Sequence, residues 1–410
     1  MSETAAQKTE LVNLDHRLPI RFEGGRLWRS WFLIWALPHT LNTVWCGLTG
    51  SIYCGIATHE IFCVVKLEIK RHSMASTTAY IDLLEKHLME DVSGIKGAPT
   101  LRKRSGRQYW YDRYRVGDSV HESYLGEDSA QLRSFIEDHK ANQEDAAARK
   151  ERMAYLIRLM NADRFLRLDR TTGSLFSALS KAGFFRLGGV VVGTHAFRAY
   201  EGELGVRLDV ELGAFTDDID IAGFEHLSVA IAETDLANPS ADEIFRGLEF
   251  KPVPSLASEH VWKWAQTKGD AVVEFLTPSF GSEEPTKRLP ALGVSAKCLN
   301  HLNYLIRQPI DAVLNYRSGV LVKIPRPERY AIHKLIVSER RGQGPNPQKA
   351  RKDRMQAEFL IHVLADDRPD ELRWAYSEAL NEGRGWRDRI DRALSKMPGA
   401  RKVLLNLNQP

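Results

Sequence analysis

The sequence is poor in cysteine. Only four cysteines occur among 410 residues, with no CxxC pair and no cysteine–histidine spacing of a zinc site. This excludes a disulfide scaffold and is typical of reduced thiols in a cytosolic protein. The chain also lacks a large excess of positively or negatively charged residues. The net charge of +4 is too small to mark the whole chain as a nucleic-acid binder, so any such role depends on local patches.

Two common nucleotide-binding motifs are also missing. No GxGxxG dinucleotide fingerprint is present. Gly188 and Gly193 have the GxxxxG spacing of a P-loop, but Thr194 stands where that loop requires lysine. Internal repeats and low-complexity tracts are not seen either. The chain is therefore read as an ordinary globular protein outside these two nucleotide-binding classes.

Length and composition predict two or three domains. Apolar residues make up 43% of the chain and charged residues 27%, which is usual for globular proteins. We divide the chain into a leader (1–73), a basic aromatic hairpin with a helical connector (74–170), a domain of mixed strands and helices (171–280) and a mainly helical C-terminal domain (281–410). The expected fold class is α+β with a mixed sheet.

The leader has an unusual charge-free run. No Asp, Glu, Lys or Arg occurs from Trp31 to His59, a length that could cross a bilayer. Pro38 and Asn42 lower its hydrophobicity, and it starts too far from Met1 for a signal peptide. Three alternatives stay open: a translated upstream region with the true start at Met74, a packed or peripheral segment, and a membrane span. Apart from this leader, we expect no membrane partner and a cytoplasmic location.

A basic, aromatic segment follows the first predicted helix. Six Lys or Arg and one Asp lie between Leu101 and Arg115, interleaved with Tyr and Trp. The turn residues Gly117 and Asp118 predict a β-hairpin here. Aromatic rings among arginines can stack on bases and neutralise phosphates. A hairpin with a solvated basic face is the alternative.

Acidic residues in two predicted strands carry the main chemical signal. Asp218 and Asp220 are two apart in FTDDIDIAGF, so in a strand their side chains share one face. Neighbouring carboxylates repel, and a divalent cation with a preference for hard oxygen ligands relieves that repulsion. Glu274, in the strand AVVEFLTP, can add a third oxygen ligand. Three carboxylates suit two Mg²⁺ or Mn²⁺ ions about 3.5–4 Å apart, the arrangement for in-line phosphoryl displacement.

A glycine turn supplies the complement. Gly193 and Thr194 directly follow the β-branched run Val190 to Val192, where a strand is expected to turn into a helix. Glycine there lets backbone N–H groups approach a phosphate, and the Thr194 hydroxyl can add a donor. Gly188 and Gly189, which precede the strand, are the less well placed alternative.

The sequence resembles the DNA polymerase beta-like nucleotidyltransferase superfamily. The resemblance lies in the order of its elements: a strand, a Gly-Thr turn, a helix, an Asp-x-Asp strand and a third strand with an acidic residue. Within this superfamily, the chain is similar to bacterial proteins related to abortive-infection and toxin–antitoxin nucleotidyltransferases. The resemblance covers roughly residues 100–365. It implies that Gly193 and Thr194 form the glycine turn and that Asp218, Asp220 and Glu274 bind metal, with Glu where Asp is more usual.

The resemblance also implies a nucleotide-binding lysine on a later helix. Lys334, in PERYAIHKLIVSERR, matches by position, and Asp353 matches less closely. From Lys323 to Arg354 there are ten Lys or Arg against three Asp or Glu, a balance that attracts a polyanion. A solvated helix lysine and a solvated basic helix pair are the alternatives.

These features predict a metal-dependent enzyme that transfers NMP from an NTP to a hydroxyl acceptor and releases pyrophosphate. The acceptor would be an RNA 3′ end or a protein, and the biological context phage defence or a toxin–antitoxin pair. Two alternatives stay open. One is a non-catalytic nucleotide- or nucleic-acid-binding module of the same fold, such as an antitoxin-like partner. The other is a DNA-binding regulator that uses the hairpin at 101–125.

Overall fold

The computed structural model describes most of the chain in two compact units, Met1–Glu68 and Ile69–Pro410. The described residues are 43–45, 51–57, 60–65, 69–91, 97–104, 106–116, 119–208, 216–233, 235–254, 260–281, 285–342, 344 and 347–407. No helix in these ranges has the length and apolar character needed to cross a membrane.

The first unit contains a small antiparallel sheet in the order β1-β2-β3. Its strands are β1 (Thr43–Trp45), β2 (Ser51–Ala57) and β3 (Glu60–Val65). Where it is described, the charge-free run therefore forms strands rather than a helix. Most of the leader lies outside the described residues, and a start at Met74 stays a prediction.

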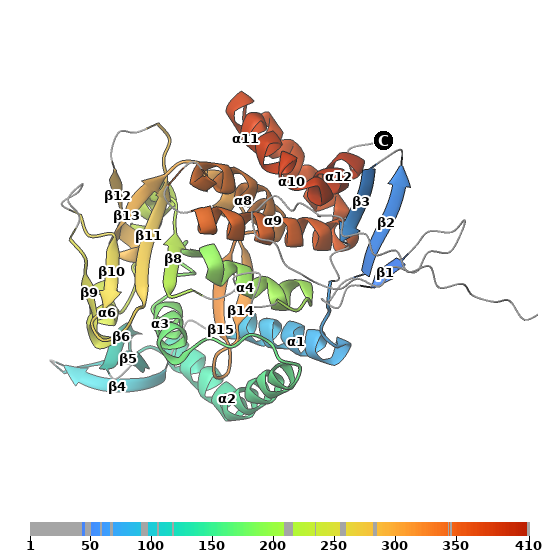
Figure 1. The fold of residues 1–410 in the computed structure, drawn as a ribbon. Helices are drawn as coiled ribbons and strands as arrows, with labels where there is room; N and C mark the ends of the chain where they lie inside the picture. Colours follow the sequence, from blue (N-terminus) through green and yellow to red (C-terminus); the bar gives the residue numbers. More distant parts are fainter. Residues whose placement is uncertain are drawn as a thin grey trace, which may run out of the picture. The chain divides into compact units, whose positions relative to one another are not determined.

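The second unit mixes helices and strands, as expected for an α+β protein (Figure 1). Its strands are β4 (Ala98–Arg104), β5 (Arg107–Val116), β6 (Ser119–Glu127), β7 (Val190–Val192), β8 (Asp218–Ala222), β9 (Phe250–Pro252), β10 (Lys263–Gln266), β11 (Val272–Pro278), β12 (Thr286–Leu289), β13 (Val294–Leu299), β14 (Ile310–Leu314) and β15 (Val320–Ile324). Its helices are α1 (Met74–Asp91), α2 (Ala130–Ala162), α3 (Arg170–Lys181), α4 (Gly193–Leu204), α5 (Glu225–Ala232), α6 (Ala241–Gly247), α7 (Leu302–Ile306), α8 (Pro327–Gly342), α9 (Pro347–Asp367), α10 (Pro369–Asn381), α11 (Arg384–Ser395) and α12 (Pro398–Leu407), with the 3₁₀ turn η2 (Pro290–Leu292).

Strand β11 is the centre of a mixed, seven-stranded sheet. Along one edge it pairs with β8 in parallel, and β8 pairs in turn with β7 antiparallel. Along the other edge it pairs with β10 antiparallel and, further on, with β13 in parallel. Strands β9 and β12 complete the sheet next to β10 and β13.

The two central strands are apolar on one face and acidic on the other. Their side chains alternate because successive residues of a strand point to opposite faces. Four core-facing side chains of these strands are fully buried, namely Ile219, Ile221, Val273 and Phe275. The opposite face carries Asp218, Asp220 and Glu274. Burying the apolar face positions the carboxylates on the other face, and a slip of one residue would reverse both faces.

The C-terminal part begins with strands and continues with helices. Strands β12 to β15 lie at 286–324, within the region that the sequence predicts to be mainly helical, and the helical series starts at Pro327. Figure 1 shows α8 to α12 gathered beside the sheet. Helices α8 and α9 pack against each other, so their facing side chains, including those of the basic run, are brought together.

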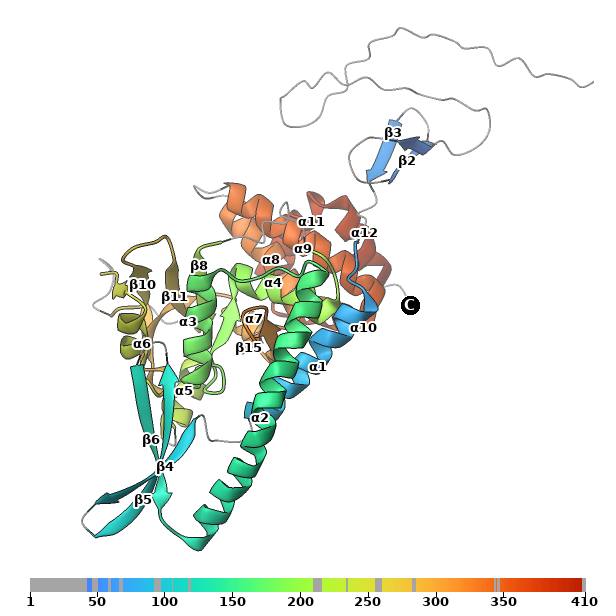
Figure 2. The same cartoon turned by 90° about the horizontal axis from the view of Figure 1, so that it is seen from below.

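The basic aromatic segment forms an antiparallel sheet in the order β4-β5-β6. Strands β5 and β6 are the predicted hairpin, and β4 adds a third strand. Figure 2 shows this sheet projecting from the second unit near the beginning of α2. Helices α1 and α2 pack side by side around a smaller apolar cluster that includes Leu83 and Leu156.

Candidate functional site

The three predicted carboxylates lie on adjacent strands. In the parallel pair of β8 and β11, Glu274 is the direct register partner of Asp220. Asp218 precedes Asp220 by two residues and therefore shares its face. The structure thus brings together all three acidic residues that the sequence selects.

Asp220 is the electrostatic centre of this group. Burial raises its pKa to about 6, with further contributions from the carboxylates of Glu274 and Asp218, while Lys334 and Arg341 act in the opposite direction. The carboxylate of Asp220 makes no hydrogen bond or ion pair with the side chains or backbone of the described residues, although its backbone is paired in the sheet. A partly buried anion without a partner is costly, and a bound cation would reduce that cost.

The glycine turn lies directly against Asp220. Gly193 opens α4 with φ of +66°, and a Cβ atom at this position would stand 2.3 Å from Oδ2 of Asp220. Val192, the residue before it, is paired with Asp220 in the β7–β8 register. The Tyr330 hydroxyl donates a hydrogen bond to the Gly193 carbonyl at 2.8 Å. This bond links the glycine turn to α8. Only glycine combines this backbone conformation with this closeness to the carboxylate.

The start of α4 is open to an anion. Its N-cap, Val192, provides no side-chain hydrogen bond to the first turn. Helix N-termini carry partial positive charge and N–H donors that bind phosphate. Beside this turn, Lys352 Nζ donates to Thr194 Oγ1 at 3.0 Å. Burial lowers the pKa of Lys352, and the neighbouring Lys334 adds to that effect.

Lys334 is held by a buried carboxylate. Its Nζ donates to Asp353 Oδ1 at 2.5 Å, and Arg341 donates to Asp353 Oδ2 at 2.7 Å. The side chain of Asp353 is 1% exposed and that of Lys334 is 10% exposed. Lys334 is therefore not a solvated helix lysine, and its contact with a nucleotide stays a prediction.

Two of the three carboxylates are paired with lysines. Lys263, on β10, donates to Glu274 Oε1 at 2.8 Å, and Lys349 lies 3.8 Å from Asp218 Oδ2. Within the described ranges, no three His, Cys, Asp or Glu side chains converge as a ready-made metal site. The donor chemistry of the three carboxylates fits Mg²⁺ or Mn²⁺. Holding a metal with all three requires Glu274 and Asp218 to exchange their lysines for the ion.

His195 follows Thr194 but belongs to the core. Its ring is buried, lies edge-on to Phe176 at 5.4 Å between ring centroids, and has no hydrogen-bond partner at either nitrogen among the described residues. Burial, followed by the charge of Arg198, lowers the pKa of His195 to about 3. This neutral histidine packs α4 against α3, so it is not available to the carboxylate face.

Comparison with known proteins identifies the family of this chain. A family model described as nucleotidyltransferase matches residues 170–381, which is just over half of the chain. The chain belongs to this nucleotidyltransferase family. A solved structure of an antigenic nucleotidyltransferase-like protein from Paracoccidioides brasiliensis is similar over 56% of this chain and 94% of that chain, with 14% identity and a TM-score of 0.27. No curated protein matches the chain.

The match to the nucleotidyltransferase family includes every predicted site residue. Gly193, Thr194, Asp218, Asp220 and Glu274 lie within 170–381, and so do Lys334 and Asp353. The match also continues past residue 280, the predicted end of the 171–280 domain, through strands β12 to β15 and helices α7 to α10. The basic aromatic sheet β4-β5-β6 lies outside it.

Sequence reasoning did not select the lysines that contact these residues. Lys349 and Lys352 belong to the basic run 323–354, but their partners come from β8 and α4, more than a hundred residues earlier. Lys263 lies in a short strand with no motif. The basic run 323–354 could have indicated Lys349 and Lys352 as candidate site residues. Lys263 is identified only by the register of β10 with β11.

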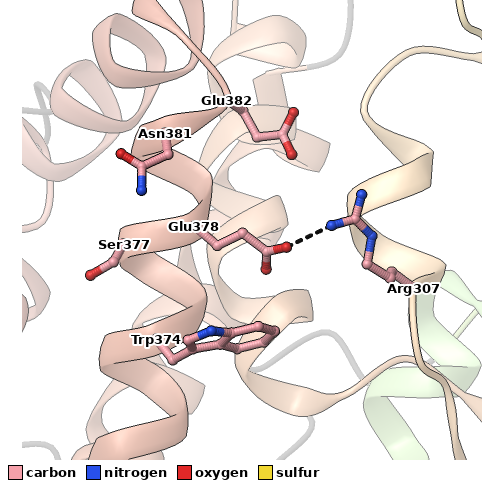
Figure 3. Close-up of a pocket in the computed structure, with 6 residues that line it drawn as sticks. All are labelled: Arg307, Trp374, Ser377, Glu378, Asn381 and Glu382. Atoms are coloured by element: carbon pink, nitrogen blue, oxygen red, sulfur yellow. Dashed lines mark hydrogen bonds and ion pairs between the residues drawn. The ribbon is translucent and has the colours of Figure 1, made fainter.

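A surface pocket of about 530 Å³ lies away from these residues on α10 (Figure 3). It is lined by Arg307, Trp374, Ser377, Glu378, Asn381 and Glu382. Glu378 is engaged by Arg307 at 2.8 Å and by Arg329 at 2.8 Å. None of the predicted site residues lines this pocket, so it is separate from the carboxylate face.

We predict that Gly193→Ala is more damaging than a matched glycine substitution. The added methyl group meets both a left-handed backbone and the Asp220 carboxylate. Gly293 has nearly the same φ, +65°, with nothing within 4 Å of an added Cβ. Gly293→Ala should cost about 1–2 kcal/mol for the backbone alone. Gly193→Ala should cost about 1–3 kcal/mol more, because overpacking adds to it. Urea unfolding of both variants measures the difference, and equal losses would contradict the close contact with Asp220.

Proposed function

We propose that this protein is a metal-dependent nucleotidyltransferase that moves NMP from an NTP to a hydroxyl acceptor and releases pyrophosphate. The observation that carries the proposal is the β8–β11 register, which sets Glu274 opposite Asp220 beside the Gly193 turn. Acidic groups next to an open helix start combine a site for cations with a site for phosphate. This combination is what a nucleoside triphosphate with its metal requires.

Asp218, Asp220 and Glu274 would hold two Mg²⁺ or Mn²⁺ ions. When bound, such ions lower the pKa of an attacking hydroxyl and neutralise charge on the leaving pyrophosphate. Glu274 is also a candidate proton acceptor, because it is a carboxylate on the same face as Asp220. The extra methylene of glutamate relative to aspartate lengthens its reach across the two strands.

The phosphates of the NTP would lie at the start of α4. Backbone N–H groups of Gly193 and Thr194 provide donors there, and Lys352 is the first side-chain cation because it already contacts Thr194. Lys334 and Arg341 contribute positive potential from behind Asp353, as their effect on Asp220 indicates. We retain Lys334 as a nucleotide-binding residue that acts mainly as a charge.

Two finer proposals rest on the sequence resemblance: a polymerase beta-like arrangement of the catalytic part, and a role in phage defence or a toxin–antitoxin pair. A cytoplasmic location is proposed from the low cysteine content. The order along the chain of the Gly193–Thr194 turn, the Asp-x-Asp strand and Glu274 supports the polymerase beta-like arrangement.

A non-catalytic module of the same fold is the second candidate. The observation in its favour is that lysines already neutralise two of the three carboxylates, Lys263 at Glu274 and Lys349 at Asp218. An ammonium group in the position of a metal would leave a site that binds nucleotide without turnover.

Label transfer separates the two candidates. The full chain is incubated with each α-labelled NTP, Mg²⁺ or Mn²⁺, and either total RNA or cell lysate. Transfer of label that is lost in Asp218→Ala and in Asp220→Ala, and retained in Asp217→Ala, supports the enzyme. Asp217 is the matched control because it is exposed and immediately precedes the same strand. Tight NTP binding with no transfer to RNA or protein would contradict the proposal and favour the module.

A further inference from the structure

The small sheet β4-β5-β6 has one anchored face and one open face. On the anchored face, Tyr114 is buried in the main core and donates to the Asn238 carbonyl at 3.1 Å. Trp110, on the same face, donates to Asp128 at 2.9 Å. These contacts show that Trp110 and Tyr114, half of the aromatic residues of β5, have a packing role. The other two, Tyr109 and Tyr111, alternate with them and lie on the opposite face.

Three tyrosines form the centre of that other face. Tyr109 and Tyr111 of β5 lie next to Tyr124 of β6, with ring centroids 6.1 Å and 5.6 Å from Tyr124. Tyr124 is 57% exposed. The guanidinium of Arg102 lies over the Tyr111 ring at 6.0 Å. None of these three rings belongs to the apolar clusters of the described residues, so they form a stacking platform rather than part of a core.

Arginines surround these rings. The strand registers place five of them on the same face, namely Arg102, Arg104, Arg107, Arg113 and Arg115. Two acidic residues share this face, Glu122 and Glu127. Glu122 pairs with Arg102 and Arg113, and Glu127 pairs with Arg107. Arg104 and Arg115 are exposed and make no ion pair with the described residues. The face, which we call the tyrosine face, therefore keeps an excess of positive charge.

We propose that the tyrosine face binds single-stranded RNA. Unpaired bases expose ring faces that stack on tyrosine, whereas the bases of a duplex are already stacked on one another. The excess arginines match the phosphate charge. The carboxylates of Glu122 and Glu127 are acceptors for 2′-hydroxyl groups, which favours RNA over DNA. In the proposed transfer reaction, RNA would then be the acceptor. This last step rests on the proposed function, whereas RNA binding by itself does not.

Binding is tested without nucleotide, so the result does not depend on transfer. The full chain is titrated into a fluorescein-labelled 16-nucleotide RNA of mixed sequence, and fluorescence anisotropy is recorded. The same sequence is tested as a duplex and as single-stranded DNA. We expect the single-stranded RNA to bind most tightly, with affinity that falls as salt rises. The double variant Tyr111→Ala/Tyr124→Ala should bind at least about tenfold more weakly, because each lost base stack is worth that order.

A matched control lies on α2. Tyr155 is 41% exposed and has the guanidinium groups of Arg152 and Arg158 over its ring at 5.2 and 5.8 Å. Tyr155→Ala removes the same chemistry elsewhere and should leave RNA affinity unchanged. Arg104→Glu/Arg115→Glu alters only exposed side chains, so it tests the tyrosine face even if the tyrosine variant misfolds. It should also weaken binding at least about tenfold, since each phosphate contact carries a salt-dependent share of the affinity.

The inference is overturned if the folded arginine variant binds RNA as tightly as the parent, or if duplex RNA or single-stranded DNA binds as well as single-stranded RNA. Label transfer to protein in lysate, with no RNA binding, would also overturn it and would leave the proposed function intact. Conversely, RNA binding that depends on the tyrosine face, without any label transfer, would support this inference and contradict the proposed enzyme.

Discussion

Asp220→Asn should lower nucleotidyl transfer by about 10²–10³-fold, because a metal ligand contributes several kcal/mol of transition-state stabilisation. The same substitution should not destabilise the protein. Asparagine keeps the shape of the side chain and removes a charge that lies beside Glu274 and Asp218 with no partner among the described residues. Function and stability therefore oppose each other at this residue.

The stability half of this prediction follows from the pKa of Asp220. Its pKa is raised to about 6, above that of an aspartate in an unfolded chain, so ionised Asp220 destabilises the folded state at pH 8. In EDTA at pH 8, Asp220→Asn should unfold at higher urea concentration, by on the order of 1 kcal/mol in stability. Added Mg²⁺ should stabilise the parent and have little effect on the variant.

Asp169 provides the contrasting control. Its carboxylate caps α3 by accepting from the Thr172 N–H at 2.9 Å, and hydrogen bonds of this kind lower its pKa despite burial. Asp169→Ala should therefore cost about 1 kcal/mol of stability, the usual value of an N-cap, and leave transfer unchanged. If Asp220→Asn behaves like Asp169→Ala, with lost stability and full activity, Asp220 is a structural residue.

Local patterns in the sequence predict individual strands and turns better than they predict partners. The alternation around Asp218 and Glu274 identifies two half-buried strands, and the structure shows both. Alternation within each strand does not reveal that the two are neighbours or that Glu274 meets Asp220. That register depends on the burial of Ile219 and Val273 in a shared core, which is a long-range effect.

The short strands that follow Glu274 are the part of the fold that local patterns do not predict. Strands β12, β14 and β15 have four or five residues each, and they lie among turns in a region read as mainly helical. Their pairing partners, not their composition, make them strands. The long helices after Pro327 lie in the part of the chain that the sequence predicts to be mainly helical.

Charged contacts between distant elements were equally hidden. Lys334 was selected as a nucleotide-binding residue from its position in a helix, yet the structure pairs it with Asp353 on the next helix. The basic run 323–354 suggested an extended surface for a polyanion. Packing of α8 on α9 instead directs part of that charge inward, toward Asp353, and part toward Asp218 and Thr194.

Asp353→Asn should destabilise the second unit by about 3–5 kcal/mol, the range observed when one partner of a buried ion pair is removed. Both oxygens of Asp353 are occupied, by Lys334 and Arg341, and asparagine cannot balance either charge. The side chain of Lys334, which is 10% exposed, would lose its ion-pair partner between the two helices. Urea unfolding followed by circular dichroism measures the loss.

An exposed pair gives the reference for this effect. Asp388 lies 3.9 Å from Arg384 on α11, and both side chains are more than half exposed. Asp388→Asn should cost less than about 0.5 kcal/mol, as is usual for surface pairs one helical turn apart. The double variant Lys334→Met/Asp353→Leu adds a second comparison, since replacing both buried charges with apolar groups should recover much of the loss. If Asp353→Asn were no worse than Asp388→Asn, Lys334 would have to find another anion or reach solvent. Lys334 and Arg341 would then be available to bind the triphosphate of the proposed substrate directly, because Asp353 would not be needed to fix their positions.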